Sequence, residues 1–311
     1  MKREVAILGG GSSGTYTAVR LQDSGKTVVV VEADDALGGH TETYTDPVTG
    51  QRDDIGVLFF HNIPVVRDYF ARFDIPLEFA EKYGIQDAVP LLALYGQGGI
   101  DYEKTTTLYI VKYMGPTFVE GLSVGGLTTV RRHNQELYEA AYDALGSDNV
   151  LLSSTVSAAE RSEKGVRLNV RIAGRHRRLP GRDRLQFNLP PLPGPLTITP
   201  SPIDGMTDVK YGSGFHEISA EEAQAAIIED LAALTTAINS TPAEPQFVTF
   251  KAHTPFQPMV SNEDISDCFY KRLWGLQGRR QTYFTGAAWQ SQDSALLWNF
   301  TEHRILPMLL K

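Results

Sequence analysis

The chain has 311 residues, a formal net charge of -8 at pH 7 and 42% hydrophobic residues. This length is enough for about two domains with a sizeable core. The acidic balance argues against a nucleic acid or an anionic membrane surface as a partner, and we expect neither. No apolar run approaches the roughly 18 residues that a membrane-spanning helix needs, so we also expect no membrane span.

Cysteine and histidine usage limits the redox and metal chemistry. The single cysteine, Cys268, excludes an internal disulfide framework and fits a reducing compartment. It could be a reactive thiol, but a buried small hydrophobic residue is the more common role, and we expect burial. The seven histidines are scattered, so no metal site is expected. The first apolar run begins at Val5, which leaves no room for a leader peptide, and we expect a cytoplasmic protein.

The first forty residues carry the most specific motif of the chain. An apolar run at 5–8 leads into Gly9-x-Gly11-x-x-Gly14, and a second apolar run follows at 28–31. The order strand, glycine turn, helix, strand is typical of a dinucleotide-binding unit. The first glycine permits the tight turn, the second lets the backbone approach a pyrophosphate, and the third lets the helix pack closely. The N-terminus of the helix would then face the phosphates.

The second apolar run ends at Glu32, an acidic residue at the tip of the predicted strand. Its carboxylate can accept hydrogen bonds from the hydroxyl groups of an adenosine ribose. NAD and FAD both present these hydroxyls, whereas the 2′-phosphate of NADP would be repelled. The unit therefore predicts a dinucleotide and leaves the choice between NAD and FAD open.

Hydrophobic periodicity predicts a mixture of helices and short strands for the rest of the chain. Residues 84–104 are ambiguous, residues 108–113 fit a strand or a helix, and the basic residues 175–178 are interpreted as a solvated turn. Ser219-x-x-Glu222 is a capping box that should open a helix. In chain order, the predicted elements are strands over 41–45 and 53–57, a helix from Pro64, a helix over 128–145, strands over 150–156 and 165–172, a helix from Ser219, a strand over 282–285 and a helix over 293–309.

Further motifs place the dinucleotide unit in a family. Gly38-Gly39-His40 follows Glu32, Asp54-x-Gly56-Val57 comes next, and a Gly-Leu-Gln-Gly-Arg-Arg-x-Thr-Tyr-Phe-Thr-Gly segment ends at Gly286, shortly before Trp289. With the N-terminal glycines, these motifs resemble the FAD-dependent amine oxidase superfamily. Within it, they look closest to the β-cyclopiazonate dehydrogenase group of fungal flavoproteins of specialised metabolism. They are more remotely similar to bacterial polyunsaturated fatty acid isomerases.

The resemblance implies FAD, bound noncovalently, and a set of cofactor-binding residues. Relatives often carry an acid just after the late glycine, where a carboxylate can bond the ribityl chain, but this chain has Ala287. The resemblance assigns no catalytic residue. It implies that Gly9, Gly11, Ser13 and Gly14 line the pyrophosphate, that Glu32 binds the adenosine ribose, that Gly39 and His40 lie along the path from the diphosphate to the flavin, that the backbone of Val156 meets the adenine, and that Gly286, with the helix start near Asp293 and Ser294, approaches the flavin.

The resemblance also implies an α/β fold with a Rossmann-like FAD-binding domain and a smaller, reduced α+β substrate domain. Complete relatives are longer, and the missing length would fall near 99–105 and near 175–189. A complete substrate pocket is therefore not guaranteed. The implied FAD-binding domain is discontinuous and takes residues 1–60, 147–188 and 275–311, whereas the substrate domain takes residues 61–146 and 189–274.

The implied reaction is hydride transfer from a small, hydrophobic metabolite to the flavin, by an oxidase or a dehydrogenase. Tyr283, Trp289 and Trp298 are candidates for the pocket wall, with core packing as the alternative. Three other functions stay open. The chain could be a flavin-dependent isomerase with no net redox change, a shortened non-catalytic relative, or a nicotinamide enzyme. The sequence does not fix the oligomeric state.

Overall fold

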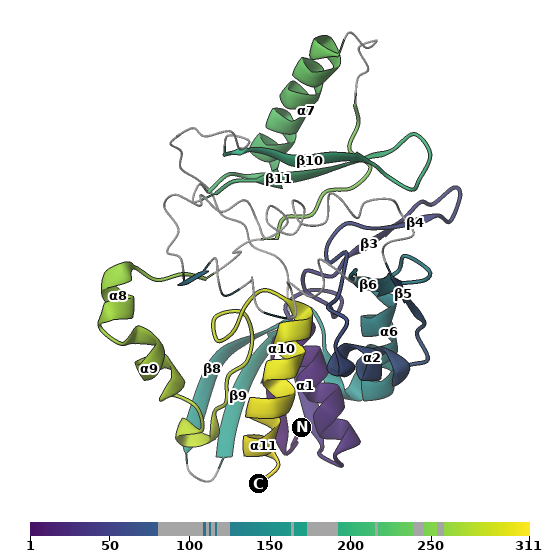
Figure 1. The fold of residues 1–311 in the computed structure, drawn as a ribbon. Helices are drawn as coiled ribbons and strands as arrows, with labels where there is room; N and C mark the ends of the chain where they lie inside the picture. Colours follow the sequence, from purple (N-terminus) through teal and green to yellow (C-terminus); the bar gives the residue numbers. More distant parts are fainter. Residues whose placement is uncertain are drawn as a thin grey trace.

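The computed structural model describes most of the chain, and its secondary structure falls into three parts (Figure 1). A lower part contains both termini, a middle part contains two small strand pairs, and a separate pair of strands with one helix lies above them. The described residues are 1–79, 108, 109, 112, 116, 125–162, 165–172, 192–214, 217–238, 245–253 and 258–311.

A three-stranded parallel sheet forms the centre of the lower part. The strand β1 (Val5–Leu8) pairs with β2 (Val28–Val31), which pairs with β7 (Val150–Leu151). The helix α1 (Ser12–Asp23) connects the first two strands. All four valines of β2 are buried, as expected for a strand with covered faces. The predicted strand, glycine turn, helix and strand are thus confirmed in order and position.

Aromatic side chains from distant parts of the sequence meet against α1. Trp298 of α10 (Ser294–Phe300) is fully buried and stacks on Tyr16 and Phe60, with ring centroids 5.7 and 5.5 Å apart. The helices α2 (Pro64–Ala71) and α6 (Glu136–Leu145) bury side chains in the same hydrophobic core. The N-terminal, central and C-terminal segments therefore share one core, and this core includes two helices from residues 61–146.

Two antiparallel strand pairs make up the middle part. The strand β3 (Thr43–Thr45) pairs with β4 (Arg52–Asp54), and β5 (Leu77–Phe79) pairs with β6 (Leu127–Thr129). The strand predicted over 41–45 is confirmed in shortened form, and the one predicted over 53–57 is found as β4, which begins one residue earlier and ends at Asp54. The helix expected over 128–145 begins only at Glu136. The first residues of the predicted helix lie in β6 instead. Asn134 accepts hydrogen bonds from the backbone and hydroxyl of Thr129, and the strand ends there.

A twisted ribbon of two long strands extends beside the parallel sheet. The strands β8 (Ser154–Ser162) and β9 (Gly165–Ile172) are antiparallel. They confirm the pair of strands expected from the sequence, but the first is divided. Ser153, with a positive φ of 48°, separates β7 from β8. The short 3-10 helix η2 (Ser147–Asn149) precedes β7.

The prediction of a strand over 282–285 is wrong. These residues run without ladder partners after the 3-10 turn η3 (Arg279–Gln281). The amide side chain of Gln277 explains the difference, because it accepts from the backbone N–H of Phe284 and donates to its carbonyl, each at 2.8 Å. Phe284 also stacks on Trp289 at 5.1 Å. Among the described residues, β1 pairs with β2 alone, and Leu8 is 52% exposed.

The upper part, which we call the roof, consists of two strands and one helix. The strand β10 (Gly194–Pro200) pairs with β11 (Thr207–Gly212), and α7 (Ala220–Ala237) lies against this pair through Ala223 and Ile227. Ser219 and Glu222 form the expected capping box at the start of α7. The roof comes from residues that the sequence assigned to the substrate domain.

The C-terminal segment returns from an arm to the core. The arm contains α8 (Asn262–Ser266) and α9 (Phe269–Trp274), and Cys268 between them is exposed, so the expectation that it is buried is wrong. Cys268 has a left-handed backbone and precedes α9, where a turn keeps it at the surface. The predicted last helix is confirmed as α10, a π-helical turn η4 (Thr301–Ile305) and α11 (Leu306–Leu309).

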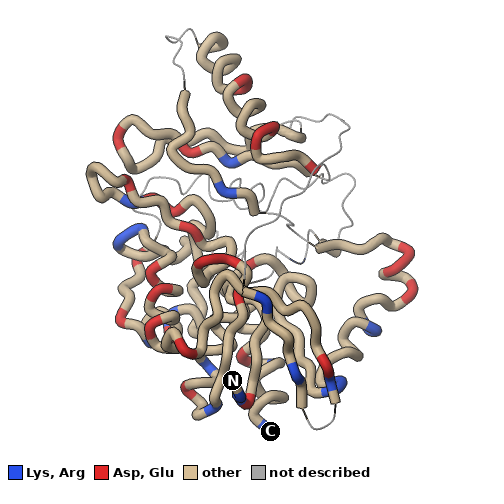
Figure 2. Tube along the Cα trace, turned by 180° about the vertical axis from the view of Figure 1, so that it is seen from behind, with Lys and Arg blue, Asp and Glu red and all other residues tan. Residues whose placement is uncertain are grey.

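Two further observations concern the whole described chain. No described helix combines the length and apolar character of a membrane span. Lys and Arg positions are interspersed with Asp and Glu along the described trace (Figure 2). The expectations for residues 84–104, 175–178 and the two shortened regions lie outside the described residues.

Candidate functional site

The glycine turn between β1 and α1 has the geometry of a ligand cradle. Gly9 has a positive φ of 97°, and its N–H donates to Val31 at 2.9 Å. A Cβ on Gly14 would lie 1.8 Å from the carbonyl oxygen of Gly9, so only glycine lets α1 pack this closely. A Cβ on Gly11 would meet only Gly39, at 3.8 Å. Gly9 and Gly14 therefore shape the turn and the packing of α1 against it, whereas Gly11 leaves the outer surface of the turn open.

The N-terminus of α1 opens toward this turn without a capping side chain. Gly11 is the N-cap residue, and no side chain bonds the first N–H groups of the helix. Such groups carry partial positive charge and attract phosphate. The second glycine pair lies against the turn, since Gly38 donates to Gly10 at 3.0 Å and Gly11 forms a parallel bridge with Gly38. The two glycine motifs found in the sequence therefore meet in space.

Glu32 lies beneath the same turn. Its carboxylate accepts from the N–H of Gly10 and, at 2.8 Å, from the N–H of Asp34. The side chain is buried, and the carbonyl of Glu32 accepts from Ser154 at the start of β8. Val156 follows two residues later in β8 and is half-buried. Glu32 and Val156 thus lie near each other at the carboxyl end of β2, and their roles toward ribose and adenine stay predictions.

The starts of α1 and α10 lie side by side. Ser12 donates to Ser294 at 2.9 Å, and Trp298 donates from its indole to the carbonyl of Ser12 at 3.2 Å. Asp293 caps α10 by accepting from Leu296 at 2.8 Å. These contacts fix the last helix against the glycine turn.

Asp293 also holds a histidine from another segment. Nε2 of His61 lies 3.1 Å from the second carboxylate oxygen of Asp293. Burial alone would lower the pKa of His61, but the hydrogen bond and negative charge of Asp293 raise it above its ordinary value. The pair therefore favours a charged imidazolium next to the start of α10.

One large cavity joins the glycine turn to the roof. Its volume is about 2730 Å³, and it is bordered by β1, the turn, the 38–61 segment, β10, β11, α7 and the segment around Gly286. Seven of the nine predicted cofactor residues line it, whereas Glu32 and Val156 do not. The seven are Gly9, Gly11, Ser13, Gly14, Gly39, His40 and Gly286.

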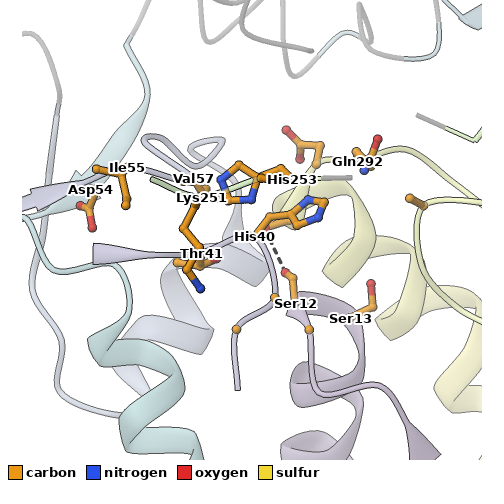
Figure 3. A pocket seen from close by; sticks show the side chains of 18 of the residues that line it. Ser12, Ser13, His40, Thr41, Asp54, Ile55, Val57, Lys251, His253 and Gln292 are labelled. Carbon is orange, nitrogen blue, oxygen red and sulfur yellow. Dashed lines mark hydrogen bonds between the residues drawn. The ribbon is translucent and has the colours of Figure 1, made fainter. Parts of the chain in front are cut away.

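Histidines and lysines gather where the cavity passes under the roof. The rings of His40 and His253 lie 4.8 Å apart, and Figure 3 shows Lys251 beside them. Burial lowers the pKa of His40, and burial together with the nearby positive groups lowers the pKa of His253 to about 4. Lys210 of β11 borders the same space, and desolvation by the surrounding protein lowers its pKa to about 8. Lys251 donates to Glu42.

Three carboxylates lie between β4 and the roof. Burial raises the pKa of Asp54 to about 6, although Thr43 and Asn134 hydrogen-bond to it. Burial and the neighbouring charge of Asp53 raise the pKa of Asp208 to about 7. Ser201 donates to Asp53 from the loop that joins the roof strands. These contacts connect the roof to β4.

The three aromatic pocket candidates have different surroundings. Trp298 is a core residue, Trp289 is half-buried against Phe284, and Tyr283 lines the cavity. Gly286 has a positive φ of 107°, and a Cβ there would meet nothing within 4 Å. Within the described residues, no group of three His, Cys, Asp or Glu is arranged to hold a metal ion.

The sequence missed the polar residues that meet under the roof. Lys210 comes from one segment and Lys251 and His253 from another, and together they follow no recognisable spacing. Asp208 likewise sits in an ordinary strand pattern. Only the position of the roof over residues 38–61 brings these groups to one cavity, so no local signal could have assigned them.

The comparison with family models agrees with the geometry of the N-terminal unit. Residues 7–73 match the NAD(P)-binding Rossmann-like domain. The segment covers the glycine turn, α1, β2, the Gly38-Gly39 pair and α2. The Rossmann-like fold expected from the sequence is confirmed.

Similar curated proteins are fungal flavoenzymes. The chain is 29% identical to the FAD-dependent oxidoreductase oblC of Cochliobolus heterostrophus, with 99% of this chain and 91% of the relative covered. It is 28% identical to the beta-cyclopiazonate dehydrogenase of Aspergillus flavus, with 97% and 92% covered. The resemblance found in the sequence is confirmed. The first alignment runs over 440 positions, more than this chain possesses, so the relative carries segments that this chain lacks.

A solved structure shares the fold over nearly its whole length. The fatty acid isomerase of P. acnes matches with a TM-score of 0.68 at 13% identity, and 98% of each chain is covered. This likeness places the roof, the middle part and the lower part in an architecture that is already known.

Proposed function

We propose that the chain is an FAD-dependent oxidoreductase. The observation that carries the proposal is the single cavity that runs from the glycine turn and the uncapped start of α1 to the space beneath the roof. A dinucleotide laid along this path would have its phosphates at α1 and its reactive ring among groups from several segments. The two fungal relatives named above support this assignment, since one is named an FAD-dependent oxidoreductase and the other a dehydrogenase.

The residues of the chain fit the cofactor at its phosphates. A Cβ on Gly11 would fill the space over the turn, and the N-terminal N–H groups of α1 have no side-chain cap. Gly9, Gly11, Ser13 and Gly14 would hold the pyrophosphate, while Gly39, His40 and Gly286 would lie along the ring and its ribityl chain. Glu32 would bind the ribose, with its carboxylate already oriented by two backbone N–H groups. We propose noncovalent attachment.

The flavin would supply hydride acceptance, and the protein would supply the surroundings. Its residues would orient a C–H bond of the substrate and exclude water. The roof, with α7 over the cavity, would cover the site. No side chain carries a catalytic assignment. We propose a small, largely hydrophobic substrate, since aliphatic residues of α7 form one wall of the cavity. We also propose that this substrate belongs to specialised metabolism.

Two finer points belong to the proposal. The FAD-binding domain would combine residues 1–60, 147–188 and 275–311, and the substrate domain would centre on the roof. Because α2 and α6 share the core of α1, residues around these helices would move with the FAD-binding domain. A cytoplasmic location fits a single exposed cysteine.

The absorbance spectrum of the purified protein tests the proposal. FAD gives bands between about 350 and 500 nm, and bound FAD should also raise the melting temperature, whereas added NAD should not. A colourless protein that gains no stability from FAD would overturn the proposal. Stabilisation by NAD alone would favour a nicotinamide enzyme.

An isomerase would pass the same spectral test, so it needs a different measurement. Turnover without consumption of oxygen or another electron acceptor would identify an isomerase. Consumption of one acceptor per product would identify an oxidase or dehydrogenase.

A further inference from the structure

We propose that His61 is a positioning residue for the proposed reaction, because it neutralises Asp293, the carboxylate that caps α10 at the border of the cavity. The inference rests on the proposed function, since it concerns the charge around a flavin bound in the same cavity. It goes beyond that function by assigning a task to this pair of side chains, which is to keep the bound FAD easy to reduce.

Asp293 uses its two carboxylate oxygens for two different contacts. Oδ1 accepts from the N–H of Leu296 at 2.8 Å and caps α10, while Oδ2 lies 3.1 Å from Nε2 of His61. Aspartate is a favoured cap, because its negative charge suits the positive end of the helix dipole. Only 12% of the His61 side chain and 14% of the Asp293 side chain are exposed. Water therefore screens the charge of this carboxylate weakly, and its field reaches into the cavity.

The backbone next to His61 is anchored to the same helix that Asp293 caps. The N–H of Phe60 donates to the carbonyl of Leu127, and the N–H of Leu127 donates to the carbonyl of Phe60, each at 2.8 Å. The fully buried ring of Phe60 stacks on Trp298 of α10, with ring centroids 5.5 Å apart. These contacts fix His61 against the start of α10.

The pair borders the cavity beside groups that would hold the cofactor. His61, Asp293 and Ser294 line it together with Ser12 and Gly286. Ser12, at the start of α1, donates to Ser294 at 2.9 Å, and α10 lies beside α1 (Figure 1). The pair therefore lies where the glycine turn, the start of α10 and the segment after Gly286 come together.

The charge of Asp293 on its own would work against reduction of a flavin. The flavin ring gains negative charge when it accepts a hydride, so a nearby unpaired carboxylate opposes this step. Burial alone would lower the pKa of His61, but the hydrogen bond and charge of Asp293 raise it above its ordinary value. An imidazolium paired with Asp293 cancels most of the field of the carboxylate and leaves its contact with Leu296 intact.

The reduction potential of the bound FAD at pH 6 tests the inference. His61→Gln leaves Asp293 charged without its counter-ion. The equilibrium for reduction should therefore become at least about tenfold less favourable, which lowers the potential by about 30 mV. Equilibration with a reference dye during slow reduction measures this value. His303→Gln, on the exposed face of η4, is the matched control and should have the potential of the wild type. A wild-type potential in His61→Gln overturns the inference.

A second substitution separates charge from structure. Asp293→Asn removes the negative charge and keeps a side chain that caps helices well. In the double variant His61→Gln/Asp293→Asn no unpaired charge is left, so the reduction equilibrium should return to within about threefold of the wild type. If His61 acted only through the structure of the site, the double variant would stay as low as His61→Gln. That result would contradict the neutralising role.

The titration of His61 gives a readout that needs no FAD. NMR should show a pKa above the ordinary value in the wild type and a pKa below it in Asp293→Asn, because burial then dominates. The same His61 titration in both proteins would overturn the ion pair.

The absorbance spectrum separates the two levels of the account. A colourless protein overturns the proposed function and the inference with it. A protein that carries the flavin bands but has the same potential in the wild type and His61→Gln overturns the inference alone.

Discussion

The lower part and the roof of this protein are built on different principles. The lower part is held by close packing, with Trp298, Tyr16 and Phe60 stacked in one core and Gly14 pressed onto the turn. The roof meets β4 through polar groups: Ser201 donates a hydrogen bond to Asp53, and burial together with the charge of Asp53 raises the pKa of Asp208. The comparison teaches that apolar packing holds the lower part together, whereas the roof is joined to β4 by polar groups whose charge can change with pH.

The largest effect should come from the core of the lower part. Trp298→Ala removes a fully buried ring that stacks on two others, and should lower the free energy of unfolding by about 4 kcal/mol. Trp274→Ala, on the exposed arm, is the matched control and should cost less than about 1 kcal/mol. Denaturant unfolding measures both. Equal losses would show that the arm, rather than the α1 core, carries the stability.

A smaller effect should come from the His61–Asp293 pair at the junction with α10. Because the pKa of folded His61 is raised, its stabilising contribution is complete below the unfolded value near pH 6.5 and is lost as pH rises through the folded pKa. His61→Gln should therefore lower the melting temperature most at pH 5.5, where the free energy of unfolding should fall by about 1 to 2 kcal/mol. The loss should be smallest at pH 8.5. His303→Gln, on the exposed face of η4, is the control.

A pH-independent loss in His61→Gln would refute the charged pair. Loss of the same size in His303→Gln would show that the effect does not belong to the junction.

The smallest effect concerns the seat of the roof. Folded Asp208 has a pKa of about 7, above its unfolded value near 3.9, so the folded state binds the proton more tightly. Stability should then fall as pH rises between about 4 and 7. Asp208→Asn should remove this fall and be more stable than the wild type at pH 8, by about 1 kcal/mol after solvent screening. Parallel pH profiles for the two proteins would contradict the contact with β4.

The sequence predicts the lower part better than the roof, for physical reasons. The turn at Gly9, the helix up to Asp23 and the valines of β2 follow local rules of backbone freedom and periodicity. The strand over 282–285 failed because a single side chain, Gln277, takes the backbone partners of Phe284, which no periodicity reveals. The helix predicted over 128–145 begins only at Glu136 in the structure, because Asn134 is held at the end of β6 by hydrogen bonds to Asp54 and Val57.

The candidate site divides in the same way. Gly9, Gly11, Ser13, Gly14, Gly39, His40 and Gly286 were found from motifs and line the cavity. Lys210, Lys251 and His253 were not found, because only the position of the roof over the 38–57 segment brings them to one cavity. Motifs encode contacts to a shared cofactor, whereas contacts to a particular substrate depend on tertiary arrangement.

The most direct test of the central claim is the affinity of Gly11→Ala for FAD. Gly11 has an ordinary backbone conformation, and a Cβ there would make only an ordinary contact, so the fold and melting temperature without FAD should be unchanged. The added methyl would stand where the pyrophosphate must approach, so the dissociation constant for FAD should rise at least about tenfold. Wild-type FAD affinity in this variant would contradict a cofactor bound at the glycine turn.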